Sequence, residues 1–106
     1  MEYNIRIIET AQTDMRNIWQ YIAVELQNPT AAELRISLLD AAIRSLKEYP
    51  ARFPLVHDDY LAYKGYRVIV VKSHLVFFII RDDDETVSVL RVLYGRRDWL
   101  RILKDG

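Results

Sequence analysis

The sequence predicts an α+β domain in which an antiparallel two-helix hairpin packs on an antiparallel sheet. Three observations lead to this class: a short apolar run opens the chain, two long segments with helical periodicity follow, and three β-rich runs with short connections fill the second half. Connections of this length permit only antiparallel pairing, because a parallel return needs a crossover of a dozen or more residues. The expected order is therefore an N-terminal strand, two helices, a three-strand meander and a short C-terminal helix.

The N-terminal strand and the first helix open the chain. Residues 3–8 are rich in β-branched side chains and end at Glu9-Thr10, which is typical of a strand. Thr10 is the expected N-cap of the first helix, and Asp14 lies in its first turn, where the helix dipole favours an acidic side chain. Apolar residues then recur at three- and four-residue spacing on one helical face, namely Met15, Ile18, Trp19, Ile22 and Leu26.

The second helix has clear signals at both ends. Asn28 is the expected N-cap and Pro29 the first helical residue, where a missing N–H costs nothing. Pro50 ends the helix. Its apolar face consists of Ala32, Ile36, Leu39, Ile43 and Leu46, widened by Leu34 and Leu38. The short connection between the helices predicts an antiparallel hairpin.

The second half of the chain is expected to form the meander. Residues 51–64 contain Pro54 and Asp58-Asp59 without a clear period, which indicates a loop. Three β-rich runs follow at residues 66–71, 75–81 and 86–93, joined by short polar connections. Residues 95–103 favour a short helix whose apolar side chains return to the core, namely Trp99, Leu100 and Leu103.

The composition limits the classes of function. The 106 residues suffice for one domain, residues 1–106, and an apolar fraction of 51% provides a core. With no cysteine and only two histidines, the chain has no disulfide framework and few metal ligands, so no metal or other cofactor is expected. Fifteen basic and fifteen acidic side chains cancel, so a nucleic-acid site would have to be a local patch. Without a membrane-spanning run or a signal peptide, we expect a cytoplasmic protein with no membrane partner.

Basic side chains gather near the C-terminus. The members of this cluster are Arg91, Arg96, Arg97, Arg101 and Lys104, opposed there only by Asp98 and Asp105. Because guanidinium groups can hold phosphate oxygens bidentately, the cluster predicts either a phosphate-binding patch or a solvated surface with some ion pairs.

Two arginines lie inside strands that are otherwise apolar. Arg67 alternates with Ile69 and Val71, and Arg91 alternates with Val87, Val89 and Leu93. A charge on such a face must reach a partner, water or a ligand, or else lay its aliphatic stem on the sheet with its head in solvent. Both interpretations stay open for each arginine.

His74 and Tyr94 are candidates for chemistry near strand ends. His74 could supply a proton at neutral pH, although a histidine near a hairpin turn is more often a surface side chain. Tyr94 could stack on a base or orient a phosphate, or it could form the rim of the core. No nucleotide-binding loop, metalloprotease motif or serine triad is present, so the ordinary enzyme classes have no support.

Five strings in this order resemble the RelE/ParE superfamily of bacterial toxins from type II toxin–antitoxin modules, formerly called plasmid stabilisation proteins. They are AQTDMRNIWQYI at residues 11–22, NPTAA at 28–32, LKEYP at 46–50, GYRVIVVKSHLVFFI at 65–79 and VLYGRRDW at 92–99. The resemblance spans nearly the whole chain. It implies a compact toxin that arrests growth and is neutralised by a cognate antitoxin encoded by a neighbouring gene.

The superfamily divides by target, and the resemblance implies two activities. RelE-like members are endoribonucleases that cut ribosome-bound mRNA without a metal. By position, Arg67 and Arg96 or Arg97 would hold the scissile phosphate, Tyr94 would stack or assist proton transfer, and His74 stands where RelE-like sequences carry an arginine. Further contacts to the target would come from Lys64, which alone remains of the lysines that RelE-like toxins carry there, and from Arg91, Arg97 and Arg101.

ParE-like members instead inhibit DNA gyrase as binding proteins without nuclease activity. The long helical hairpin and the neutral total charge favour this alternative. A chemically inert, antitoxin-bound relative and a small RNA-binding module are further alternatives. The sequence alone leaves the target open.

Overall fold

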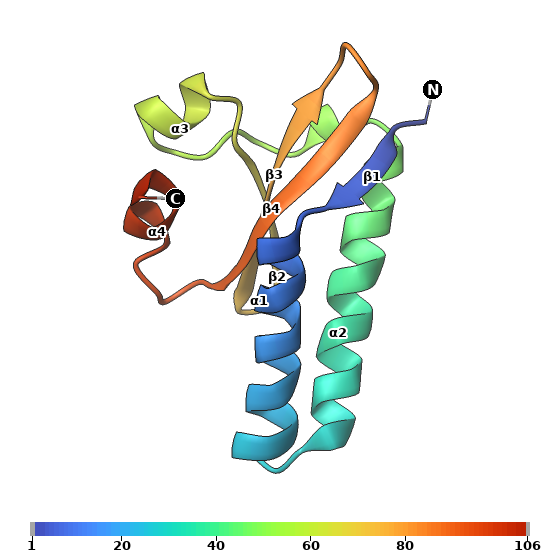
Figure 1. Cartoon of the computed structure of the whole chain (residues 1–106), viewed down its shortest axis with the longest axis vertical. Helices are drawn as coiled ribbons and strands as arrows, with labels where there is room; N and C mark the ends of the chain where they lie inside the picture. Colours follow the sequence, from blue (N-terminus) through green and yellow to red (C-terminus); the bar gives the residue numbers. More distant parts are fainter. Residues whose placement is uncertain (1, 106) are drawn as a thin grey trace.

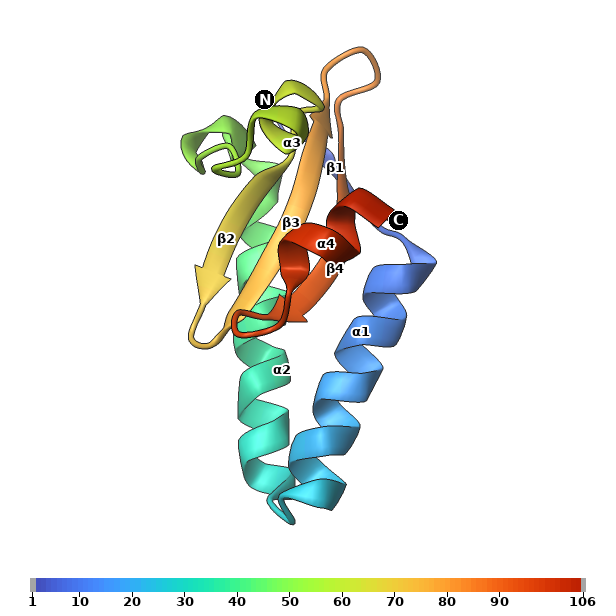
Figure 2. The same ribbon diagram turned by 90° about the vertical axis from the view of Figure 1, so that its left-hand side faces the viewer.

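A computed structural model describes residues 2–105 and has the predicted α+β architecture (Figure 1). The elements are β1 Asn4–Ile7, α1 Glu9–Gln20, a π-helical turn Tyr21–Glu25, α2 Pro29–Arg44, 3-10 turns Ser45–Lys47 and Pro50–Arg52, α3 Asp59–Tyr63, β2 Arg67–Val71, β3 His74–Arg81, β4 Thr86–Tyr94 and α4 Trp99–Asp105. The α1–α2 hairpin extends well beyond the sheet at one end (Figures 1 and 2). Among residues 2–105, no helix combines the length and apolar composition needed to cross a membrane.

The four strands form one sheet in the order β1-β4-β3-β2. The predicted meander is confirmed, because β2, β3 and β4 pair antiparallel. The expectation of a wholly antiparallel sheet is wrong for β1, which pairs parallel to β4. The helical hairpin lies between β1 and the meander in sequence, so the short-connection argument does not apply to this strand.

The sheet is covered on both faces, and each face has its own core. The hairpin covers one face, with a buried cluster of Ala11, Leu39, Ile43, Leu46, Ile69, Val76, Phe78, Val87, Val89 and Val92. Figure 2 shows α4 on the opposite face, where the buried residues are Val56, Leu61, Phe77, Leu93 and Leu103. Trp99 packs against this second cluster with its ring 5.4 Å from that of Phe77, so the predicted return of the C-terminal helix to the core is confirmed.

The helix boundaries confirm one cap and correct another. The Asn28 side chain accepts a hydrogen bond from the Ala31 amide, and Pro29 is the first residue of α2, as predicted. The first helix begins at Glu9, with Ile8 as an N-cap that makes no side-chain bond, so the prediction of Thr10 as the cap is wrong. The expected loop at 51–64 also contains α3, whose first amides are capped by Asp58.

A β-bulge in β4 corrects the predicted environment of Arg91. The register passes from Phe77 paired with Arg91 to Phe78 paired with Val89, which leaves Leu90 without a partner. Because one extra residue reverses the alternation of faces, Arg91 does not share the face of Val89. Its side chain is free to reach the edge of the sheet.

Candidate functional site

A groove lies between the helical hairpin and the ends of β3 and β4. We call it the hairpin groove; its volume is about 710 Å³. Its lining residues are Asp14, Asn17, Ile18, Tyr21, Ile22, Leu26, Ala31, Arg35, Ser73, His74, Val92, Tyr94 and Arg97. The groove therefore combines aliphatic side chains from the hairpin with polar groups from the turn between β2 and β3 and from the end of β4.

His74 is buried beside the groove and paired with a cation. An Arg35 Nη1 lies 2.8 Å from His74 Nδ1 and donates to Ser73 Oγ at 3.1 Å. A guanidinium can only donate, so Nδ1 is the acceptor and the proton of the neutral imidazole lies on Nε2. Burial, and then the charge of Arg35, lower the pKa of His74 below its ordinary value. At neutral pH the imidazole is therefore uncharged and presents an N–H rather than a free lone pair.

The last residue of β4, Tyr94, and the turn that follows it, which contains Arg97, reach the same groove. The Tyr94 ring lies 5.8 Å from the His74 ring at 59°, and the two residues are paired across β3 and β4. Gly95 donates its amide to the Ser73 carbonyl at 2.8 Å, and a Cβ on Gly95 would lie only 3.3 Å from that oxygen. A glycine thus permits the close approach of the two backbones, and the following turn brings Arg97 to the groove.

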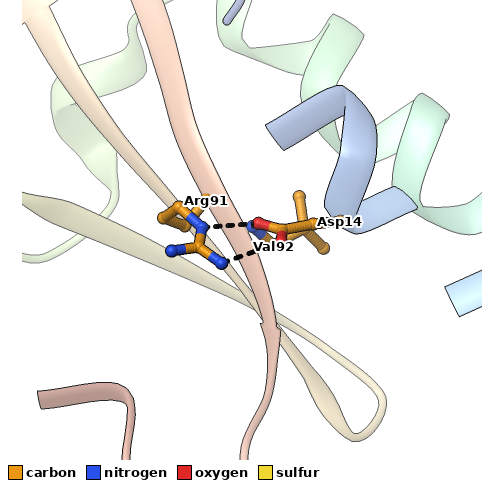
Figure 3. Close-up of polar contacts among 3 residues, drawn as sticks. All are labelled: Asp14, Arg91 and Val92. Carbon is orange, nitrogen blue, oxygen red and sulfur yellow. Dashed lines mark hydrogen bonds and ion pairs between the residues drawn. The ribbon is translucent and has the colours of Figure 1, made fainter. Parts of the chain in front are cut away.

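Asp14 forms a polar anchor at the rim of the groove (Figure 3). It accepts from Arg91 Nε at 2.7 Å, from Arg91 Nη2 at 2.9 Å and from the Val92 amide at 2.9 Å. The pairing of β1 with β4 ends at Val89, so the Val92 amide lies on an edge with no neighbouring strand. The hydrogen bonds to Asp14 raise the pKa of Arg91. Asp14 therefore connects α1 to β4 beyond Val89, where β1 no longer pairs with β4.

Arg67 is placed apart from the groove. Its guanidinium donates to the carbonyls of Phe53 at 2.7 Å and Ala51 at 3.3 Å. It pairs with Phe78, four positions along β3 from His74, which corresponds to about 13 Å along the strands. Arg67 and His74 are therefore not brought together in this structure.

The remaining predicted cations are dispersed. Arg96 is exposed and does not line the groove, and Arg101 makes an exposed ion pair with Asp105. Lys64 lies on the ring of Tyr60 beside α3. Of the arginines predicted to bind the target, Arg97 lines the groove directly, whereas Arg91 is held by Asp14 at its rim. Within residues 2–105, no group of three acidic or histidine side chains could hold a metal ion.

The sequence as a whole matches one family. The family model for the ParE toxin of the type II toxin–antitoxin system, parDE, matches residues 5–99. The chain belongs to this family. No curated protein matches it at the level of the whole sequence.

Solved structures with the same fold as this ParE-family toxin come from both branches of the superfamily. A chain of the chromosomal ParDE system from P. aeruginosa has a TM-score of 0.73 at 13% identity, covering 88% of this chain and 96% of that one. A chain of the RelBE2 complex from Mycobacterium tuberculosis has a TM-score of 0.64 at 18% identity, covering 89% and 99%. A mutant of E. coli toxin RelE in the free state has a TM-score of 0.66 at 14% identity, covering 99% and 98%. At these sequence identities the likeness shows a shared fold only.

Two charged residues of the ParE-family toxin's groove, Asp14 and Arg35, are missing from the predicted site residues. Asp14 lies between Ala11 and Ile18 on the buried face of α1, and an acid at an apolar position of a helix is a signal that a buried partner exists. Arg35 precedes Ile36 at the border of the apolar face of α2, where an arginine gives no such signal. Its contact with His74 spans 39 residues and follows from the tertiary fold.

Proposed function

We propose that this ParE-family toxin arrests bacterial growth by binding DNA gyrase and not by cutting RNA. The observation that carries the proposal is that the protein's own oxygens engage two of the arginines that the sequence offers to the target. Arg67 donates to two carbonyls, and Arg91 is held bidentately by Asp14. Asp14 occupies the Nε–Nη2 edge with which Arg91 would hold a phosphate bidentately, and the two carbonyls occupy Nη1 of Arg67, so each guanidinium has fewer donors left for a phosphate.

The groove lacks a free base of the kind that RNA cleavage needs. Attack by a 2′-hydroxyl needs a base for its proton, an acid for the leaving oxygen and cations for the developing charge. His74 is neutral, and its Nδ1 lone pair faces Arg35. A base would therefore have to be created by breaking this contact.

The outer end of the hairpin suits a protein target. Tyr21, Val24 and Leu26 lie around the π-helical turn and are each more than half exposed, although all three are large and apolar. Tyrosine flanked by aliphatic side chains is a common centre of protein–protein contacts. We assign the gyrase contact to this segment, which we call the hairpin tip.

We propose further that the cognate antitoxin, encoded by a neighbouring gene, covers the hairpin groove. Two relatives of the same fold are solved as toxin–antitoxin complexes, RelBE2 from Mycobacterium tuberculosis and RelE-RelB from Pyrococcus horikoshii. Apolar side chains of an antitoxin segment would pack on the aliphatic wall of the groove, and its carboxylates would approach Arg35 and Arg97. Since Arg91 and Arg101 already have carboxylate partners, they contribute less than the sequence suggests. The complex should weaken as salt rises.

The proposal is tested in cells by comparing two exposed tyrosines. Tyr21→Ser removes an aromatic side chain from the hairpin tip, whereas Tyr63→Ser removes one from α3, which lies apart from the hairpin (Figure 1). We expect induced wild-type protein to stop DNA synthesis before protein synthesis, Tyr21→Ser to restore colony formation, and Tyr63→Ser to remain toxic. Loss of protein synthesis first, or equal toxicity of the two variants at equal soluble expression, would count against the proposal.

RelE-like cleavage of ribosome-bound mRNA stays a second candidate because of one observation. His74, Tyr94, Arg35 and Arg97 line a single groove and include side chains of the types that this chemistry uses. If it operates here, His74→Ala and Tyr94→Phe should each abolish toxicity. If gyrase binding through the hairpin tip operates, both variants should keep most of it.

A further inference from the structure

The outward face of α2 carries an exposed stripe of two leucines and an alanine that ends at Ser45, whose hydroxyl accepts from Arg52 Nη2 at 3.1 Å. Leu34 is 65% exposed and Leu38 is 39% exposed, and Ala41 and Ser45 continue the line at four-, three- and four-residue spacing. We call these four residues the outer stripe. The buried residues of α2, including Ala32, Leu39 and Ile43, point about 160° away around the helix. Leu34 and Leu38 therefore form a second apolar face and do not widen the first one.

The order of side chains along the outer stripe is asymmetric. Its N-terminal half carries two leucines, and its C-terminal half carries a small alanine and a serine. Spacing of this kind is that of a helix–helix seam, in which large side chains enter gaps between residues of the facing helix. Two copies packed antiparallel would set each Leu34 over Ala41 and Ser45 of the second copy, with the Leu38 side chains meeting at the centre.

The charges beside the stripe favour the same arrangement. Glu33 lies near the N-terminal end of α2 and Arg44 at its C-terminal end, on the flank that faces α1, and both are exposed. Within one copy Glu33 accepts from Trp19 Nε1 at 3.3 Å and Arg44 pairs with Asp40 at 2.9 Å, and these exposed contacts are weak enough to be shared with a second copy. In the antiparallel register that centres on Leu38, Glu33 lies level with Arg44 of the second copy, and the pair occurs twice. A parallel two-fold pair would place this flank of the two copies on opposite sides of the seam, so Glu33 and Arg44 would not meet. The antiparallel pair also aligns the helix dipoles favourably.

We propose that the outer stripe is a self-association surface through which two copies of the toxin form an antiparallel α2–α2 dimer. One helix from each copy buries an area at the small end of the range for specific interfaces, so the dimer is weak and its population rises with protein concentration. The outer stripe contributes none of the residues that line the hairpin groove, although Ala31 and Arg35 of the same helix do. Two toxins could thus be presented together to a symmetric partner.

The absence of cysteine from the chain permits a sharp test of the register. Each of Leu38→Cys, Leu34→Cys and Val70→Cys introduces a single thiol into the full chain, and the purified proteins are oxidised at several concentrations. Val70 is the matched control, since it is 68% exposed and lies on β2, outside the helix that carries the stripe. In the proposed dimer two Leu38→Cys thiols face each other, whereas the residues at position 34 are about 12 Å apart along the helices. A disulfide needs Cα atoms within about 7 Å.

We expect Leu38→Cys to form a covalent dimer and the other two variants to remain monomeric. Cross-linking at position 34 would indicate a parallel pair and overturn the register, and equal cross-linking of Val70→Cys would indicate random collision. Sedimentation without added thiols provides the second measurement. Glu33→Arg or Arg44→Glu alone should raise the dimer dissociation constant at least tenfold, and the two together should restore it. A wild-type chain that stays monomeric up to millimolar concentration, or whose outer stripe is buried only when antitoxin binds, would overturn the proposal.

Discussion

Asp14 provides the most direct test of how the hairpin is held to the sheet. Its carboxylate is nearly buried and accepts three hydrogen bonds, two from Arg91 and one from the Val92 amide. Asp14→Ala leaves a partly buried guanidinium and an edge amide without their partner, and breaking a buried ion pair from one side costs about 3–5 kcal/mol. Because about 1 kcal/mol shifts the midpoint of a domain this size by about 4 °C or more, the midpoint should fall by at least about 12 °C.

The measurement is thermal and urea unfolding followed by circular dichroism, with Asp40→Ala as the control. Asp40 makes an exposed ion pair with Arg44 on the same hairpin, and such pairs are worth at most about 1 kcal/mol. The double variant Asp14→Leu/Arg91→Met should lose less free energy of unfolding than the sum of the losses of Asp14→Leu and Arg91→Met measured singly, because neither charge is left unpaired. A loss for Asp14→Ala no larger than that of Asp40→Ala would refute the structural role assigned to this anchor.

Two further predictions follow from the other polar contacts. Because the pKa of His74 is lowered in the folded state, the unfolded chain binds the proton more readily, so the free energy of unfolding should decline as pH falls below about 6.5. His74→Gln should flatten this part of the pH profile. Arg67→Ala removes the donor to the Ala51 and Phe53 carbonyls and should cost about 1–3 kcal/mol in urea unfolding. If Arg67→Ala leaves the free energy of unfolding unchanged, the two carbonyl contacts do not stabilise the fold and the arginine is available to bind a ligand.

The parts of the fold that the sequence predicted depend on local signals. The start of α2 follows from Asn28 and Pro29 alone, since a cap and the first helical residue act within one turn. The meander follows from short connections, which leave strands only one way to pair. By contrast, α3 has five residues, too few for a helical period to be visible, and only its cap at Asp58 gives a signal.

The candidate site depends on contacts between residues that are distant in the sequence. Asp14 and Arg91 are separated by 77 residues, so their pairing needs both the parallel addition of β1 and the bulge at Leu90. The sequence left open whether an arginine within an apolar strand reaches a partner, a ligand or solvent, and the fold supplies the partner from the protein itself. His74 and Tyr94 meet because the strands that carry them pair in register, whereas the same register sets Arg67 apart.

The gyrase hypothesis is tested most directly by giving one preparation of the purified toxin two substrates. The first assay measures supercoiling of relaxed plasmid by DNA gyrase, and the second measures cleavage of translated message by primer extension. We predict that supercoiling is inhibited in proportion to toxin while the message stays intact, and that Tyr21→Ser loses the inhibition whereas Tyr63→Ser keeps it. Intact supercoiling together with message cleavage that depends on His74 and Tyr94 would contradict the account and assign the toxin to RNA.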